Sequence, residues 1–177
     1  LITLIFNALK AIIIDENLFK IPIICVGNFF VGGTGKTPLS IYIYSLLRRK
    51  KFNPSIIRKY YSSHLDEINL TKNKVKNFFH NEKRSLSILR AVKKSNVIVM
   101  DDGLQDVSIK KDLNIVCFNS IDLIGNGFLL PAGPLRNRLK KLNDCQIAVI
   151  NGKRNIAFEK KLKIISKKIK IYQSIYK

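Results

Sequence analysis

Short, mainly apolar runs recur along the chain and are separated by polar segments or by segments with a helical pattern. Apolar runs bounded by turn residues predict buried strands, and they fall at residues 21–26, 55–58, 97–100, 113–118 and 146–150. Between them, apolar residues at helical spacing predict helices over residues 37–51 and 82–94. This alternation predicts an α/β fold with a mostly parallel sheet flanked by helices on both faces.

The two ends of the chain have their own patterns. Residues 1–14 are strongly apolar but are interrupted by Asn7 and Lys10, and they fall short of the roughly 20 residues that span a bilayer. We therefore expect residues 1–20 to hold an apolar helix that either packs on the domain or lies on a membrane surface. Residues 21–177 are expected to form one domain, whose tail from Lys153 predicts an amphipathic helix and then a short strand.

A glycine-rich loop follows the first predicted strand and precedes the first predicted helix; it reads Gly32-Gly33-Thr34-Gly35-Lys36-Thr37. Glycines let the backbone N–H groups of such a loop converge on phosphate oxygens at a helix N-terminus. Lys36 is expected to reach the terminal phosphates and the Thr37 hydroxyl to bind Mg²⁺. Phe30 stands where the strict phosphate-loop pattern has glycine, so an ordinary glycine-rich turn is the alternative interpretation.

A second chemical signal lies where the predicted strand at residues 97–100 ends in Asp101 and Asp102. Carboxylates at the C-terminal end of a buried parallel strand are typical of the acid that holds Mg²⁺ in phosphate-loop proteins. Aspartate also tolerates turn conformations, so this pair can instead mark an ordinary turn. The preceding glycine-rich loop favours the metal interpretation.

Residues 124–136 contain too much glycine and proline for a regular element and predict a shaped loop. The loop ends in Arg136, whose planar guanidinium can bind a phosphate through two parallel hydrogen bonds. The alternative is an arginine on the surface without a ligand.

Composition adds charge and a compartment to this picture. The chain has 32 Lys and Arg against 12 Asp and Glu, a net charge of +20. The basic residues are spread along the whole chain without interleaved aromatic residues, so we expect no nucleic-acid partner, whereas attraction to anionic lipid stays open. Three scattered cysteines in apolar runs predict buried free thiols in a reducing compartment: Cys25, Cys117 and Cys145.

Three blocks in this order resemble the tetraacyldisaccharide 4'-kinase family of the lipid A pathway in Gram-negative bacteria: VGNFFVGGTGKTP, VIVMDDGLQD and GNGFLLPAGPLR. The resemblance covers residues 21–152. It implies a P-loop NTPase-like fold, in which the missing glycine at Phe30 is a family form of the loop.

The resemblance also implies an activity and a location. Family members transfer the ATP γ-phosphate to the 4'-hydroxyl of a tetraacylated glucosamine disaccharide 1-phosphate, with Mg²⁺, at the cytoplasmic face of the inner membrane. The implied catalytic residues are Lys36, Asp66, Asp102 and Arg136, with Asp66 as the candidate base. The residues implied to bind the ATP phosphates are Gly32, Gly33, Thr34, Gly35, Lys36 and Thr37. The implied metal ligands are Thr37, Asp101 and Asp102.

The chain departs from the family pattern at several points. Residues 57–61 read IRKYY where the family has S-R-G-Y-G, Asp106 replaces a usual His, and Asn137 replaces a usual Glu. The family's C-terminal region, which bears an Asp-His-His block, would follow Lys177. The alternative function is therefore a degenerate or truncated ATP-binding module that does not phosphorylate lipid; an unrelated P-loop ATPase or GTPase is a third hypothesis, and a nucleic-acid motor is the last.

Overall fold

The computed structural model describes residues 21–175. This part of the chain divides into two compact units, one of residues 21–26 and 37–113 and the other of residues 27–36 and 114–175. The predicted apolar helix of residues 1–20 lies outside the described residues. In both units the strands pair in parallel, which confirms the predicted α/β class.

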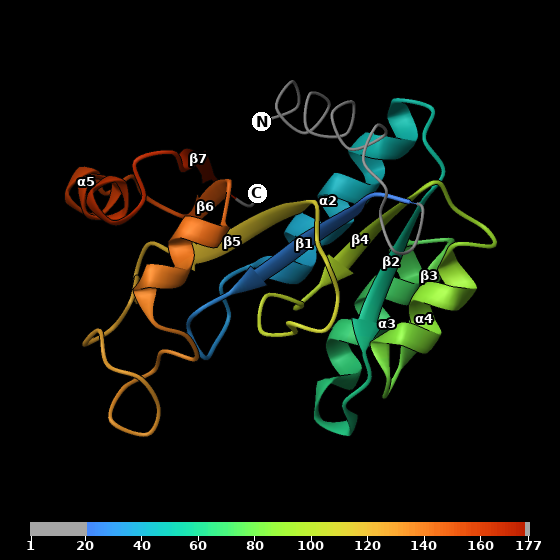
Figure 1. Cartoon of the computed structure of the whole chain (residues 1–177), viewed down its shortest axis with the longest axis horizontal. Coiled ribbons are helices and arrows are strands. Elements are labelled where there is room, and N and C mark those ends of the chain that lie inside the picture. Colours follow the sequence, from blue (N-terminus) through green and yellow to red (C-terminus); the bar gives the residue numbers. More distant parts are fainter. Residues whose placement is uncertain (1–20, 176–177) are drawn as a thin grey trace. The chain divides into compact units, whose positions relative to one another are not determined.

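The first unit alternates strands and helices along a four-stranded sheet with the order β3-β2-β4-β1. Its elements are β1 (Ile23–Asn28, whose last two residues belong to the second unit), α2 (Lys36–Arg49), β2 (Pro54–Lys59), the 3₁₀ helix η1 (Ser62–His64), α3 (Leu65–Lys74), β3 (Phe78–Asn81), α4 (Arg84–Ala91) and β4 (Val97–Asp101). Strands β1, β2 and β4 are buried almost throughout, as expected for central strands of a parallel sheet. Helix α4 packs against β2 and β3 (Figure 1).

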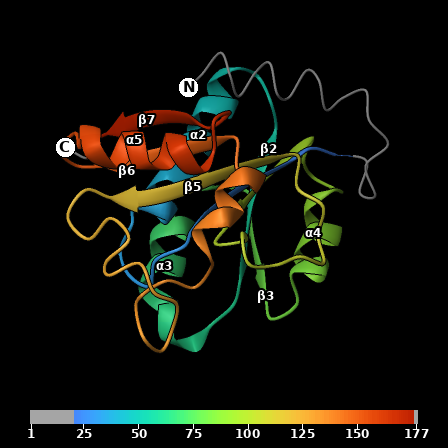
Figure 2. The ribbon, with the colours of Figure 1, turned by 60° about the vertical axis from the view of Figure 1, so that its left-hand side comes forward.

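The second unit has the strand order β5-β6-β7. It contains β5 (Leu113–Asn119), the 3₁₀ helix η2 (Leu139–Asp144), β6 (Ile147–Asn151), α5 (Ile156–Ile165) and β7 (Lys170–Ser174). Helix α5 lies beside β6 and β7 in both views (Figures 1 and 2). It is anchored by Phe158 and Leu162, which are buried, while the rest of its surface is largely exposed. The predicted amphipathic helix and short strand of the tail are thus confirmed.

One α-helix and one strand went unpredicted. Helix α3 begins at Leu65, between the predicted strand at residues 55–58 and the predicted helix at residues 82–94, and β3 follows it. Helix α3 buries only Ile68 and Thr71, so its apolar periodicity is too weak to detect. Its charges are nevertheless arranged as a helix dipole favours, with acids in the first turn and lysines in the last.

The three cysteines confirm their prediction, since each is buried and none forms a disulfide. Burial raises the pKa of the Cys25 thiol to about 12. Because the thiolate is the reactive form, Cys25 acts as a small apolar core residue.

Candidate functional site

Asp101 lies at the centre of a buried polar cluster in the first unit. It ends β4, and its carboxylate is fully buried. The Thr37 hydroxyl donates to Asp101 Oδ2 at 3.0 Å, and the Ser40 hydroxyl donates to Asp101 Oδ1 at 3.1 Å. Helix α2 supplies both hydroxyls from adjacent turns, so the start of the helix is tied to the end of β4. The structure therefore brings together two of the predicted metal ligands, Thr37 and Asp101.

Arg58 joins this cluster from β2, which pairs with β4 so that Arg58 lies opposite Asp101. Its side chain is 2% exposed, and Nη1 donates to Asp101 Oδ2 at 2.6 Å and to Thr37 Oγ1 at 3.0 Å. A buried carboxylate is costly unless it is paired and hydrogen-bonded. Arg58 supplies the compensating charge in the described structure.

The other arm of Arg58 reaches α3. Its Nη2 donates to Glu67 Oε2 and lies 3.3 Å from His64 Nδ1. Asp66, the predicted base, is the preceding residue in the first turn of α3, and it is exposed. One guanidinium thus connects the Asp101 cluster to the helix that carries Asp66.

Asp102 differs from Asp101 in its backbone conformation. Its backbone φ is +54°, in the left-handed region that non-glycine residues seldom adopt, and its N–H donates to the Val26 carbonyl at 2.8 Å. Gly103 follows, and a Cβ there would collide with the Met100 side chain. The chain turns sharply at this point, and the predicted role of Asp102 in metal binding stays a prediction.

The oxygen atoms around Asp101 fit Mg²⁺ by their chemistry. Hydroxyl and carboxylate oxygens are the hard ligands that Mg²⁺ prefers, and in this structure Thr37 Oγ1 and Asp101 Oδ2 both accept from Arg58 Nη1. Across residues 21–175, no group of three or more His, Cys, Asp or Glu side chains is placed to hold a metal. Mg²⁺ needs no such group, because it is usually held by one or two carboxylates with water and substrate phosphates.

The glycine-rich loop belongs to the second unit up to Lys36. Gly32 and Gly35 have φ values of +137° and +78°, so the loop uses the backbone freedom of glycine as predicted. Side chains from two strand ends hold its carbonyls: Asn119 of β5 donates to the Gly33 carbonyl at 3.3 Å, and Asn151 of β6 donates to the Thr34 carbonyl. These two hydrogen bonds fix the course of the loop backbone.

Asn28 and Arg136 brace the entrance of the same loop. Asn28 donates to the carbonyls of Phe30 at 2.6 Å and Gly32 at 3.3 Å, and its own Oδ1 accepts from the Arg136 guanidinium. The Arg136 N–H donates to the Phe29 carbonyl at 2.7 Å. Arg136 therefore lies against the loop, where it supports Asn28. Its predicted contact with phosphate stays a prediction.

Sequence reasoning missed several residues that shape this region. Asn119 and Asn151 each follow a predicted apolar strand directly, which is the position where ligand-binding side chains of parallel sheets occur. Arg58 ends a predicted strand in the same way. A search for polar residues at predicted strand ends would have found all three.

Parallel strands, the loop that enters α2 and the carboxylate at the end of β4 define a P-loop NTPase-like α/β fold. HypB, a hydrogenase maturation factor from Archaeoglobus fulgidus, shares this fold with a TM-score of 0.57 at 12% identity, over 96% of this chain and 85% of that one. LpxK from Aquifex aeolicus, crystallised in complex with ATP, aligns with a TM-score of 0.65 at 28% identity, over 84% of this chain and 54% of that one.

The sequence comparisons identify the family. The model for tetraacyldisaccharide-1-P 4'-kinase, LpxK, matches residues 1–78 and 66–176. The tetraacyldisaccharide 4'-kinase of Pelagibacter ubique is 42% identical over 161 residues, 89% of this chain and 51% of that protein. That of Methylobacillus flagellatus is 35% identical over 175 residues, 84% and 52% respectively. The chain belongs to the tetraacyldisaccharide 4'-kinase family, and it spans about half the length of these curated relatives.

Proposed function

We propose that this protein transfers the γ-phosphoryl group of ATP to the 4'-hydroxyl of a tetraacyldisaccharide 1-phosphate. The observation that carries the proposal is the hydrogen bond of 3.0 Å between the Thr37 hydroxyl and the Asp101 carboxylate. Thr37 directly follows Lys36 in the sequence, so the metal-binding hydroxyl and the phosphate-binding lysine are joined by one peptide bond. The ATP complex of Aquifex LpxK supports ATP as the donor.

The glycine-rich loop binds the ATP phosphates and stabilises their negative charge. Lys36 and the loop N–H groups hold the β- and γ-phosphates, and Arg136 keeps the loop in shape through Asn28. Thr37 and Asp101 would hold Mg²⁺, which supplies positive charge against the phosphate oxygens. Because the transferring group spreads its charge over three oxygens, positioning and positive charge account for most of the catalysis.

Asp66 is our candidate for the base that accepts the proton of the acceptor hydroxyl. Glu67, its neighbour, already accepts from the buried Arg58, so its carboxylate is engaged in that pair. Asp66 is exposed in the first turn of α3 and is therefore open to an acceptor. Arg58 fixes the turn that carries Asp66 through Glu67 and His64.

We place the protein at the cytoplasmic face of the inner membrane as a peripheral protein. The acceptor carries four acyl chains, and the net charge of +20 favours an anionic lipid surface. Among residues 21–175, no helix has the length and apolarity required to cross a bilayer.

The test is phosphate transfer from radiolabelled ATP to tetraacyldisaccharide 1-phosphate in detergent micelles, followed by chromatography of the lipid. We expect Lys36→Ala to lower kcat/KM at least 100-fold, whereas Lys93→Ala, an exposed lysine of the first unit, leaves it within twofold. ATP binding without transfer would overturn the kinase proposal in favour of an ATP-binding module. Equal activity of Lys36→Ala and wild type would overturn the assignment of the loop.

A further inference from the structure

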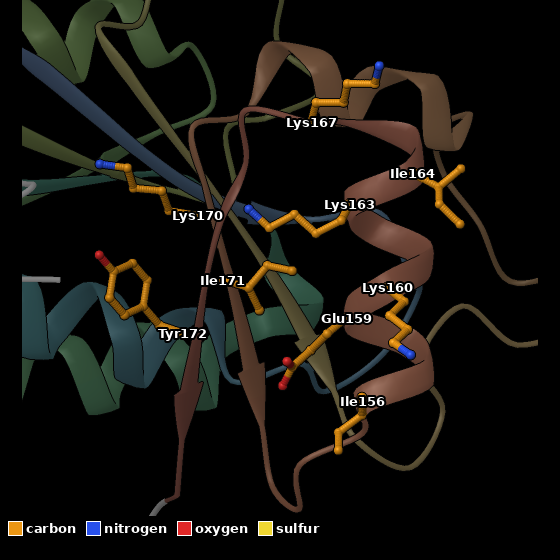
Figure 3. A pocket seen from close by; sticks show the side chains of 9 residues that line it. All are labelled: Ile156, Glu159, Lys160, Lys163, Ile164, Lys167, Lys170, Ile171 and Tyr172. Atoms are coloured by element: carbon orange, nitrogen blue, oxygen red, sulfur yellow. The ribbon is translucent and has the colours of Figure 1, made fainter.

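A shallow hollow of about 970 Å³ lies between α5 and β7, within the second unit and on elements that hold none of the proposed catalytic residues. Figure 3 shows Glu159 and Lys163 reaching from α5 toward the strands and Ile171 pointing from β7 toward the helix. Ile164 points away from the strands, on the outer side of α5. The hollow and the outer side of the helix together form what we call the α5–β7 surface.

The α5–β7 surface is much more basic than the chain as a whole. Residues 153–170 contain eight Lys and Arg among 18 residues, whereas the chain contains 32 among 177. Their single acid, Glu159, accepts from Arg154 at 3.0 Å. The general lysine content of the chain does not explain this density. The segment therefore carries a local excess of positive charge, which is complementary to an anionic surface.

Exposed isoleucines accompany these lysines. Ile156 is 57% exposed and Ile164 is 80% exposed. Helix α5 already anchors itself through Phe158 and Leu162, so these two isoleucines are not needed for its packing. Lysines beside exposed apolar side chains are typical of segments that lie at the boundary between lipid headgroups and acyl chains.

We propose that the α5–β7 surface docks the protein on an anionic phospholipid bilayer. Lysine side chains contact headgroup phosphates, and the exposed isoleucines enter the boundary region beneath them. The inference rests on the proposed function for its biological setting, because a lipid acceptor resides in a bilayer. Nucleic acid is also attracted to a basic surface, but exposed isoleucines do not strengthen its binding. Bases stack on aromatic side chains, and Tyr172 is the single aromatic residue that lines the hollow.

The test measures binding of the 177-residue chain to vesicles, without ATP or acceptor. Vesicles of phosphatidylcholine and phosphatidylglycerol at 3:1 are compared with pure phosphatidylcholine by sedimentation at low and moderate salt. Three lysines that line the hollow are changed together, Lys160→Gln, Lys167→Gln and Lys170→Gln. The matched control changes three exposed lysines of the first unit, Lys50→Gln, Lys93→Gln and Lys94→Gln.

We expect the hollow variant to lose roughly 100-fold in affinity for the anionic vesicles, about fivefold per lysine, and the control to lose less than threefold. Ile164→Ser should weaken binding further without changing its salt dependence, since it removes an inserted group and no charge. Three results would each overturn the proposal: no binding of the wild type to anionic vesicles, equal losses in both triple variants, or tighter binding of the wild type to single-stranded RNA than to vesicles.

Phosphate transfer measured in detergent micelles keeps this inference separate from the proposed function. We expect the hollow variant to retain wild-type transfer there, because none of its changes touches the loop or Asp101. A chain that binds vesicles but transfers no phosphate would refute the kinase proposal alone. A chain that transfers phosphate but does not bind anionic vesicles would refute the docking proposal alone.

Discussion

Arg58→Met is the change that most directly tests the Asp101 cluster. Methionine keeps an unbranched side chain in the core but removes the charge that faces Asp101 at 2.6 Å. Asp101 is fully buried, so its carboxylate would lose this charge in a site without solvent, where the Thr37 and Ser40 hydroxyls are among its remaining donors. Glu67 would also lose its partner, but it is 39% exposed and can be solvated.

The expected loss comes almost entirely from Asp101. Leaving one partner of a buried ion pair uncompensated costs about 3–5 kcal/mol, whereas the loss at the half-exposed Glu67 is about 0–1 kcal/mol. For a protein of this size each kcal/mol lowers Tm by about 2–4 °C. Arg58→Met should therefore lower Tm by roughly 6–20 °C, and Arg58→Lys, which keeps the charge but only one donor arm, by less.

The change of Tm on adding a divalent metal ion makes this test specific for the proposed metal site. In the wild type, Arg58 Nη1 contacts the two oxygens proposed for Mg²⁺, so Mg²⁺ without nucleotide should stabilise the protein little. In Arg58→Met those oxygens lose the guanidinium, and added Mg²⁺ or Mn²⁺ should recover several degrees of the lost Tm.

Arg84→Met is the control for the metal effect. Arg84 is also nearly buried; it pairs with Asp106 and donates to the Asp102 backbone carbonyl, and the structure records no hydrogen bond from it to Thr37 Oγ1 or to the Asp101 carboxylate among the described residues. This variant should lose stability and gain none from metal. The measurement is the Tm of the wild type, Arg58→Met and Arg84→Met by scanning calorimetry, with and without metal. Equal responses to metal in both variants, or a loss below about 1 kcal/mol in Arg58→Met, would refute the reasoning.

Three further predictions concern single residues. Asp66→Asn should lower kcat by about 10²–10⁴ and leave the ATP dissociation constant unchanged; a normal kcat removes Asp66 as the base. Asn151→Ala should weaken ATP binding about fivefold, since the hydrogen bond to the Thr34 carbonyl is lost; titration calorimetry that shows unchanged affinity contradicts this. Burial tends to raise the pKa of Asp106, but hydrogen bonds from Ser108 and Arg84 hold it below its ordinary 3.8. Asp106→Asn should therefore be less stable than wild type at pH 7, and urea titrations should show the gap closing as the pH falls through that lowered pKa; a gap that does not change with pH contradicts the pairing.

The sequence predicted the parallel α/β architecture and the strands that carry the site. Apolar runs bounded by turns are reliable for central strands, and β1, β4, β5 and β6 are nearly all buried. The glycine-rich loop was also found, because its chemistry depends on residue types at fixed spacing. Local patterns of this kind need no knowledge of distant partners.

The unpredicted features depend on contacts between residues distant in sequence. Arg58 and Asp101 are 43 residues apart, and they meet because β2 and β4 pair in a register that places them side by side. Asn151, at the end of β6, donates to the Thr34 carbonyl of the glycine-rich loop, 117 residues away in sequence. A sequence without alignment shows neither the strand order nor the register, so such pairs stay hidden even when each residue is visible at a strand end.

The register of β2 against β4 also bears on the departure from the family pattern at residues 57–61. It shows that this departure is weak evidence against activity. In residues 57–61, the positions that differ from S-R-G-Y-G are Ile57, Lys59 and Tyr61, whereas the arginine is kept as Arg58. Ile57 is a buried core residue of β2, and Tyr61 is exposed. Arg58 alone among the five reaches Asp101, Thr37 and Glu67 through its side chain in the described structure. The substituted positions surround the cluster without supplying its charges, so the contacts that hold the proposed metal ligands remain in place.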